Sequence, residues 1–215
     1  MIVQKNAVDN VVVPQMQQKR RLSYETASIP FGRFCLKLGL TPNILTGIAF
    51  LISLASAALY WKGYLLWGAV VMVLAMLSDM LDGATARAGN CGTKFGGILD
   101  HVSDRYAEAA ILMGIGASKV VNPLWAMFAL FGMIAASYTR ETAESQGKIE
   151  NVAVGAVGRL EKFIIIIIGS LVENFAPGYN ALTYSLVLVG AVSYLTSIQR
   201  LIYAKKILDG REARK

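Results

Sequence analysis

Four aspartates, Asp79, Asp82, Asp100 and Asp104, lie within apolar sequence that otherwise resembles membrane-spanning helix. A carboxylate at the centre of such a helix costs roughly 2.5–3.5 kcal/mol on insertion-based scales, so four of them oppose insertion by roughly 10 kcal/mol. The chain must therefore offset these charges when it folds. Bound cations are the simplest means of doing so.

The composition indicates the class of protein. Hydrophobic residues make up 55% of the 215 residues and charged residues only 16%, and the apolar residues fall in long blocks. Long apolar blocks are typical of spanning helices, not of the helices of soluble domains. At about 20 residues per crossing, the chain has room for roughly six helices with short loops. We therefore expect an all-α, polytopic integral membrane protein with six transmembrane helices.

Helix-start and turn signals place these spans along the chain. Thr41-Pro42-Asn43 and Asn122-Pro123 are typical of helix starts, and Pro177-Gly178 is typical of a turn. The expected spans are about 43–61, 65–87, 97–118, 122–144, 160–176 and 180–204.

The sequence outside the spans predicts three smaller parts. Residues 1–22 show no signal-peptide pattern, and we expect a cytosolic N-terminal leader there. Residues 23–37 mix apolar side chains with basic ones, which suits a helix at the membrane interface. We expect this interfacial helix to begin a transmembrane domain that comprises residues 23–205. Residues 206–215 are expected to form a basic cytosolic tail.

The distribution of Lys and Arg predicts the orientation. With six spans, both termini share one side with the loops that join spans two to three and four to five. Nearly all basic residues outside the spans fall on that side, and only Lys62 and Lys119 fall on the other. By the positive-inside rule, that side faces the cytosol. We expect an integral protein of the cell membrane whose termini and active site face the cytosol, with Cys35 and Cys91 as reduced thiols.

The net charge of +7 follows mainly from this topology. Attraction to anionic lipid headgroups is a secondary effect. Membrane lipids are therefore the expected surroundings, and no nucleic-acid partner is expected.

The spacing of the aspartates predicts how they converge. Asp79 and Asp82 are i,i+3, and Asp100 and Asp104 are i,i+4, so each pair projects from one face of its helix. Glycines between the pairs permit a tight hairpin, so all four carboxylates can point into one cavity. Oxygen ligands in this number suit Mg²⁺, Mn²⁺ or Ca²⁺, and a pair of such ions is a common clamp for phosphoryl transfer. Glu108 lies one turn further along this stripe, and we interpret it as a structural partner for a cation such as Arg105.

The segment from Asp79 to Asp104 resembles a known family signature. It reads DMLDGATARAGNCGTKFGGILDHVSD, similar to D-x2-D-G-x2-A-R-x8-G-x3-D-x3-D of the CDP-alcohol phosphotransferases. All eight specified positions are filled: Asp79, Asp82, Gly83, Ala86, Arg87, Gly96, Asp100 and Asp104. The six-helix layout and the segment from Thr41 to Thr46 are also similar to that family.

This resemblance implies a transferase that moves a phosphatidyl-type group from a CDP-linked lipid to an alcohol and releases CMP. By position, Asp79, Asp82, Asp100 and Asp104 would hold two divalent cations, Mg²⁺ or Mn²⁺, and Asp104 would be the general base. Asp79, Gly83, Ala86, Arg87 and Gly96 would form the nucleotide site. The family commonly forms homodimers, so a homodimer is also expected.

The acceptor is indicated by basic residues near the cytosolic ends of the later spans. Arg140, Arg159, Lys162 and Arg200 are similar to the basic positions of the phosphatidylinositol-phosphate and archaetidylinositol-phosphate synthase branch, where they bind the phosphate of inositol 1-phosphate. One position departs from that branch, because Thr142 stands where a second basic residue is usual. A phosphorylated acceptor is an anion and needs cations to hold it beside a pyrophosphate.

Several alternatives remain open at this point. The same chemistry could use glycerol 3-phosphate, serine or another polyol as acceptor, and the donor could carry diacylglycerol or archaeol chains. The basic residues could also reflect only the positive-inside rule. A distant alternative is a cation-coupled membrane transporter, in which intramembrane carboxylates carry the coupling ion.

Overall fold

The computed structural model describes residues 28–149, 152, 154–155 and 157–213. These residues form an all-α structure in which a helical segment over residues 28–37 precedes the six long helices. The long helices are α2 (Pro42–Trp61), α3 (Leu65–Gly89), α4 (Lys94–Ala117), α5 (Pro123–Ser145), α6 (Arg159–Phe175) and α7 (Ala181–Glu212).

Three of the helices begin at side-chain caps that the sequence makes possible. The hydroxyl of Thr41 accepts a hydrogen bond from the backbone N–H of Ile44 at α2, and Thr93 accepts one from Gly96 at α4. Asn122 caps α5 in the same way, immediately before a proline at the first helical position. Such caps satisfy backbone donors that the helix itself leaves unpaired, and proline costs nothing at that position.

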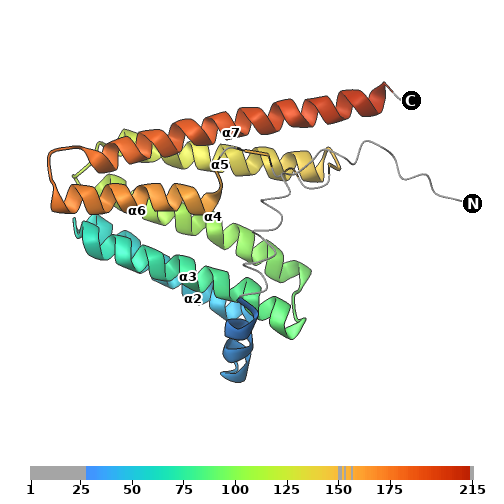
Figure 1. The fold of residues 1–215 in the computed structure, drawn as a ribbon, viewed down its shortest axis with the longest axis horizontal. Coiled ribbons are helices and arrows are strands. Elements are labelled where there is room, and N and C mark those ends of the chain that lie inside the picture. The colour runs from blue at the N-terminus through green and yellow to red at the C-terminus, as the bar shows by residue number, and fades with distance from the viewer. Residues whose placement is uncertain (1–27, 150–151, 153, 156, 214–215) are drawn as a thin grey trace, which may run out of the picture.

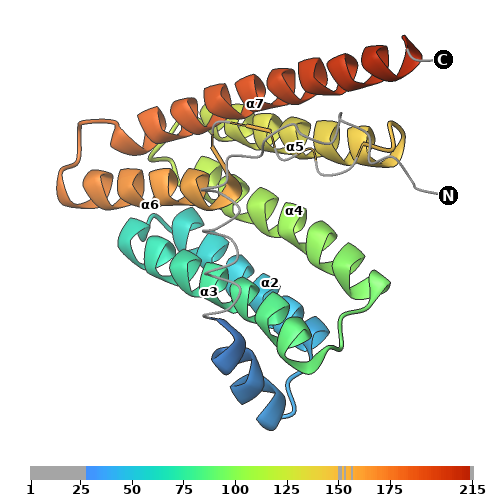
Figure 2. The same cartoon turned by 45° about the vertical axis from the view of Figure 1, so that its right-hand side comes forward.

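The helices pack as a bundle in which α2 and α3 lie side by side, α4 packs on α2, and α5 pairs with α7 (Figures 1 and 2). The helix α6 bridges the two halves, because it contacts both α3 and α7. A buried apolar core joins them, and its largest members include Tyr60, Met72, Leu112, Ile115, Ile166, Leu182 and Leu186.

Large apolar side chains also cover the outside of the bundle, among them Leu51, Trp67, Met127, Phe131 and Tyr184. In the described part of the chain, α2, α3 and α7 are long and apolar enough to cross a membrane. The length and hydropathy of the helices therefore support three of the six predicted spans. The other three helices do not meet this description by length and hydropathy. Charged and polar side chains lower the hydropathy of α4 and α5, and α6 has only 17 residues.

The observed bounds also bear on the predicted segments at the two ends. The predicted leader, residues 1–22, and residues 23–27 of the predicted interfacial helix lie outside the described residues. The helical segment 28–37 lies across the end of α3, where Gly32 packs directly on the backbone of Ala84 and Thr85. At the other end, α7 continues as helix to Glu212.

Candidate active site

Three of the four aspartates lie together at the hairpin between α3 and α4. Asp79 and Asp82 extend from α3 and Asp100 from α4, and one carboxylate oxygen of each lies within 4.8 Å of those of the other two. The turn between these helices passes through Asn90, whose φ of 47° is left-handed. A cluster of carboxylate oxygens is the ligand set that Mg²⁺ and Mn²⁺ accept in proteins, so these residues fit a divalent cation.

A hydroxyl group from α2 orients one of these carboxylates. Thr46 Oγ1 donates a hydrogen bond to Asp82 Oδ2 at 2.6 Å, and both residues are buried. Thr46 lies one turn inside α2, whose start is fixed by the Thr41 cap. The helix α2 therefore supports the carboxylate cluster although it supplies no carboxylate itself.

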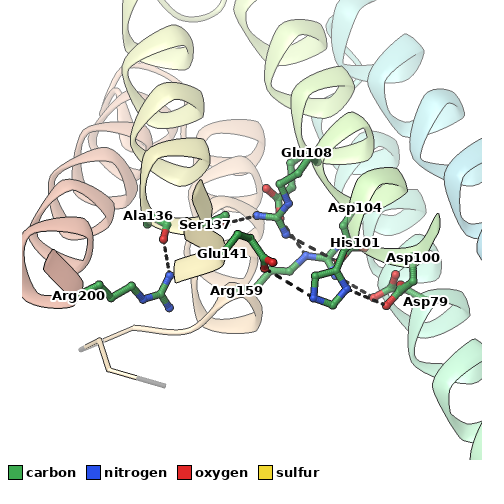
Figure 3. Close-up of polar contacts among 11 residues, drawn as sticks. Asp79, Asp100, His101, Asp104, Glu108, Ala136, Ser137, Glu141, Arg159 and Arg200 are labelled. Atoms are coloured by element: carbon green, nitrogen blue, oxygen red, sulfur yellow. Dashed lines mark hydrogen bonds and ion pairs between the residues drawn. The ribbon is translucent and has the colours of Figure 1, made fainter. Parts of the chain in front are cut away.

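Asp104 is joined to the cluster through an arginine. Arg159, the first residue of α6, pairs through Nη1 with Asp79 Oδ2 at 2.9 Å and through Nη2 with Asp104 Oδ1 at 2.8 Å (Figure 3). Arg105 approaches the other oxygen of Asp104 at 3.8 Å. The four predicted metal residues thus form a group of three, with the fourth held across the guanidinium of Arg159.

The third nitrogen of Arg159 points to a buried glutamate. Arg159 Nε donates to Glu108 Oε1 at 2.9 Å, and Arg105 Nη2 lies 3.0 Å from the same oxygen. The interpretation of Glu108 as a partner of Arg105 is therefore confirmed. Arg105 also donates to the hydroxyl of Ser137, which links α4 to α5 (Figure 3). Glu108 is fully buried, and its Oε2 has no hydrogen-bond partner among the described residues.

A cavity extends from these charged groups into the bundle. Asp79, Asp104 and Arg159 line its polar end, and Met72, Met76 and Phe163 are among the apolar residues that line the rest. The ionic groups therefore lie beside apolar side chains in a cavity that is too small for a hydrocarbon chain.

The predicted nucleotide residues lie on the same hairpin. Gly83 and Ala86 are on α3, and a side chain added at Gly83 would meet the guanidinium of Arg87 at 3.2 Å. Arg87 Nη2 donates to Ser28 Oγ at 3.2 Å, so this arginine also ties the segment 28–37 to α3. Gly96 lies against α2, because an added Cβ would be 2.9 Å from Asn43 Oδ1.

The predicted acceptor residues have different partners. Arg159 contacts the carboxylates, Arg140 pairs with Glu144 at 2.9 Å, and Arg200 donates to the carbonyl oxygens of Ala136 and Val154 at 2.6 and 2.9 Å. Lys162 is 6% exposed and lies within electrostatic range of Glu108, Arg105 and Arg200. These side chains come from α5, α6 and α7, and of the four only Arg159 is paired with the carboxylates of α3 and α4 among the described residues.

The sequence-based candidate set did not include Thr46, Arg105 or Ser137. Their signal is weak, because single hydroxyl residues are common in apolar helices and Arg105 is one of several basic residues that fall within the predicted spans. Arg159 was predicted as an acceptor residue, and its pairing with two aspartates had no sequence signal.

Comparisons with known proteins agree with this arrangement. Residues 39–198 match the family model of CDP-alcohol phosphatidyltransferases. The archaetidylinositol phosphate synthase of Pyrococcus horikoshii is 41% identical over 83% of this chain and 90% of its own length. That of Methanothermobacter thermautotrophicus is 36% identical over 78% of this chain and 84% of its own.

Solved structures give the same result. The phosphatidylinositol phosphate synthase of Mycobacterium tuberculosis, solved in complex with manganese and citrate, has a TM-score of 0.74 and 32% identity over 82% of this chain and 88% of its own. A second structure of that enzyme, with CDP-DAG bound, also has a TM-score of 0.74 and covers 82% of this chain and 92% of its own. The family model spans most of the chain, and the matches include most of the length of these relatives. The chain therefore belongs to the CDP-alcohol phosphatidyltransferase family of enzymes.

Proposed function

We propose that this enzyme transfers a phosphatidyl-type group from a CDP-linked lipid to a hydroxyl of inositol 1-phosphate and releases CMP. The observation that carries the proposal is the contact between the carboxylates of α3 and α4 and the basic residue Arg159 of α6. That contact places a metal-binding group beside a cation suited to an anionic acceptor. The printed names of the relatives, which are inositol phosphate lipid synthases, support the same acceptor.

The carboxylates are proposed to hold two divalent cations, Mg²⁺ or Mn²⁺. Asp79, Asp82 and Asp100 already bring their oxygens within 4.8 Å of one another, and Asp104 completes the set of four. The manganese in the structure of the M. tuberculosis enzyme supports this ligand chemistry. Bound cations would neutralise the donor pyrophosphate and the departing phosphate of CMP.

Asp104 is proposed as the general base. The acceptor oxygen forms a bond to the lipid-linked phosphorus, the bond from that phosphorus to the bridging oxygen breaks, and CMP takes the electron pair. The hydroxyl proton passes to a carboxylate oxygen of Asp104. Asp104 lies on the wall of the cavity and is 15% exposed, so its carboxylate is accessible from the cavity. A positioned base typically contributes about 10²- to 10⁴-fold to such a step.

The donor is proposed to bind along the hairpin, with its phosphates at the carboxylates of α3 and α4. Asp79, Gly83, Ala86, Arg87 and Gly96 lie on α3 and α4 around the carboxylates and would contact the cytidine nucleotide. The guanidinium of Arg87, exposed beside Gly83, is suited to phosphate oxygens. The CDP-DAG bound in the M. tuberculosis enzyme supports a donor of this chemical type.

The acceptor phosphate is proposed to bind among Arg140, Arg159, Lys162 and Arg200. These cations come from three helices, and Lys162 is buried without an ion pair among the described residues, which suits an anion that arrives with its own charge. Thr142 stands in place of a further basic residue, so the four named residues would carry this role without it.

The setting of the reaction is also part of the proposal. All six helices α2–α7 would cross the membrane, because the charged side chains of α4 and α6 turn toward the site and not toward lipid. Residues 1–22 would form a cytosolic leader, 23–205 the transmembrane domain and 206–215 a basic extension. Both termini and the site would face the cytosol, and the enzyme would act as a homodimer.

Release of CMP by the purified protein tests this function. We expect CMP from a CDP-linked lipid and Mg²⁺ or Mn²⁺ with inositol 1-phosphate, and little or none with inositol, glycerol 3-phosphate or serine. If another alcohol, and not inositol 1-phosphate, gives CMP, the proposed acceptor is wrong but the proposed transfer reaction stands. Activity that survives removal of divalent ions by a chelator would contradict the metal-assisted reaction.

A further inference from the structure

We infer that Arg159 is an exchangeable counter-ion of the metal site, retained by Glu108, and that it couples divalent-cation binding to binding of the acceptor phosphate. The acceptor part of this inference rests on the proposed function. The metal part does not depend on which alcohol the enzyme uses.

The geometry of Arg159 is the first step. One guanidinium binds three carboxylates, with Asp79, Asp104 and Glu108 all at 2.8–2.9 Å (Figure 3). Asp79 also belongs to the group of carboxylates that fits a divalent cation. A cation at that group and the guanidinium therefore compete for the carboxylate of Asp79 and repel each other, because both are positive.

Glu108 differs from the two aspartates in its surroundings. It is fully buried, and Arg105 holds the same Oε1 at 3.0 Å, so Glu108 is fixed in place from two sides. Its second oxygen has no hydrogen-bond partner among the described residues, which leaves its charge dependent on the two arginines. When a cation displaces the guanidinium from the aspartates, the bond from Arg159 Nε to Glu108 can persist. Glu108 is thus a positioning residue for Arg159.

The consequence is a coupling between two ligands. Displacement frees Nη1 and Nη2 of Arg159, the two donors that face the cavity side of the aspartates. A planar guanidinium with two free donors is suited to a phosphate group. The cation and the acceptor phosphate therefore assist each other's binding, and the coupling must be reciprocal.

Titration of the purified protein with Mn²⁺, followed by the electron paramagnetic resonance signal of free Mn²⁺, tests the metal part. We expect Arg159→Gln to bind Mn²⁺ about fivefold or more tightly than the unmodified protein, the lower end of typical coupling between sites. Glu108→Gln should bind Mn²⁺ more weakly, because without the Glu108 carboxylate the guanidinium of Arg159 stays paired with Asp79 and Asp104. In an Arg159→Gln background, Glu108→Gln should change the affinity less than twofold.

Arg211→Gln is the matched control, because it removes one positive charge from an exposed arginine whose hydrogen bonds to the described residues go to the backbone oxygens of Gly147 and Lys148. Its Mn²⁺ affinity should stay within twofold of the unmodified protein. Unchanged or weaker Mn²⁺ binding by Arg159→Gln would overturn the inference. This measurement does not depend on whether the Glu108→Gln variant folds.

The acceptor part is measured with the same signal. Inositol 1-phosphate should tighten Mn²⁺ binding about fivefold in the unmodified protein and leave Arg159→Gln unchanged. If CMP release confirms inositol 1-phosphate as acceptor but Mn²⁺ binding ignores it, the coupling is wrong and the proposed function stands. If CMP release identifies another alcohol, the proposed acceptor fails, and tighter Mn²⁺ binding by Arg159→Gln still supports the exchange.

Discussion

At the scale of single residues, the hydroxyl of Thr46 orients Asp82 through a buried hydrogen bond of 2.6 Å. Thr46→Val keeps the shape of the side chain and removes this donor. Groups that orient metal ligands are typically worth about 10- to 100-fold in metal affinity. We expect Thr46→Val to weaken Mn²⁺ binding about 10-fold and Thr46→Ser, which retains the hydroxyl, to bind nearly as well as the unmodified protein. Equal losses in both variants would contradict the role of the hydrogen bond.

Asp104 carries the prediction on the chemical step. Asp104→Asn removes the carboxylate that would accept the proton, so CMP release should fall at least about 10²-fold. Binding of the CDP-linked lipid, measured directly with labelled donor, should remain. Asp209→Asn makes the same chemical change at an exposed position of α7 and serves as the control. Turnover retained by Asp104→Asn would exclude it as the base.

The same scale shows what sequence can and cannot predict about the site. The spacings of Asp79–Asp82 and Asp100–Asp104 predict shared helix faces, and the hairpin brings three of these carboxylates together as expected. The pairing of Arg159 with Asp79 depends on how α6 packs against α3, because these two residues are 80 positions apart in the chain. Local periodicity carries no information on such a contact, so the sequence could name Arg159 but not its partners.

At the scale of helices, close packing of α2 against α4 depends on Gly114. A Cβ added there would lie 2.8 Å from the Cα of Ala57, a distance that forces the backbones apart. Overpacking of this kind typically costs about 1–3 kcal/mol. Gly114→Ala should therefore lower the apparent Tm of the purified protein by several degrees.

Gly97 of the same helix is the matched comparison for that substitution. A Cβ there meets nothing within 4 Å, and alanine is favoured over glycine in a helix interior by about 1 kcal/mol. Gly97→Ala should leave the apparent Tm unchanged or slightly raised. A similar loss of Tm in both variants would show that the effect does not come from the contact with Ala57.

The helix bounds were predictable wherever proline, asparagine or glycine interrupts the apolar sequence. The predicted starts at 43 and 122 fall within one residue of the starts of α2 and α5, where caps and prolines specify the first turn. The end of α7 was not predictable in this way. The apolar pattern stops near residue 204, but the helix continues to Glu212 through a charged segment that includes Asp209 and Gly210, both of low helix propensity.

At the scale of the whole molecule, charge is divided between the interior and the two ends of the bundle. Arg159 pairs with Asp79 and Asp104 inside the bundle, so charged residues on α4 and α6 are compatible with a spanning helix although hydropathy alone does not identify α4 and α6 as spans. Most of the remaining basic residues lie at the helix ends and tails that share one side of the predicted topology. Sequence thus predicts an orientation from the basic residues, but hydropathy alone does not predict which polar helices span.

The orientation makes a prediction that two cysteine positions can test. Cys91 is exposed in the loop after α3, and Lys62 is exposed in the loop before it, so the two positions would lie on opposite sides of the membrane that α3 is proposed to cross. A membrane-impermeant maleimide should label Cys91 only in inside-out vesicles. In a Cys35→Ala, Cys91→Ser background, Lys62→Cys should be labelled only in right-side-out vesicles. Labelling of both positions from one side would mean that α3 does not cross, and the reverse pattern would place the aspartates and most of the basic residues on the outer side, against the positive-inside rule.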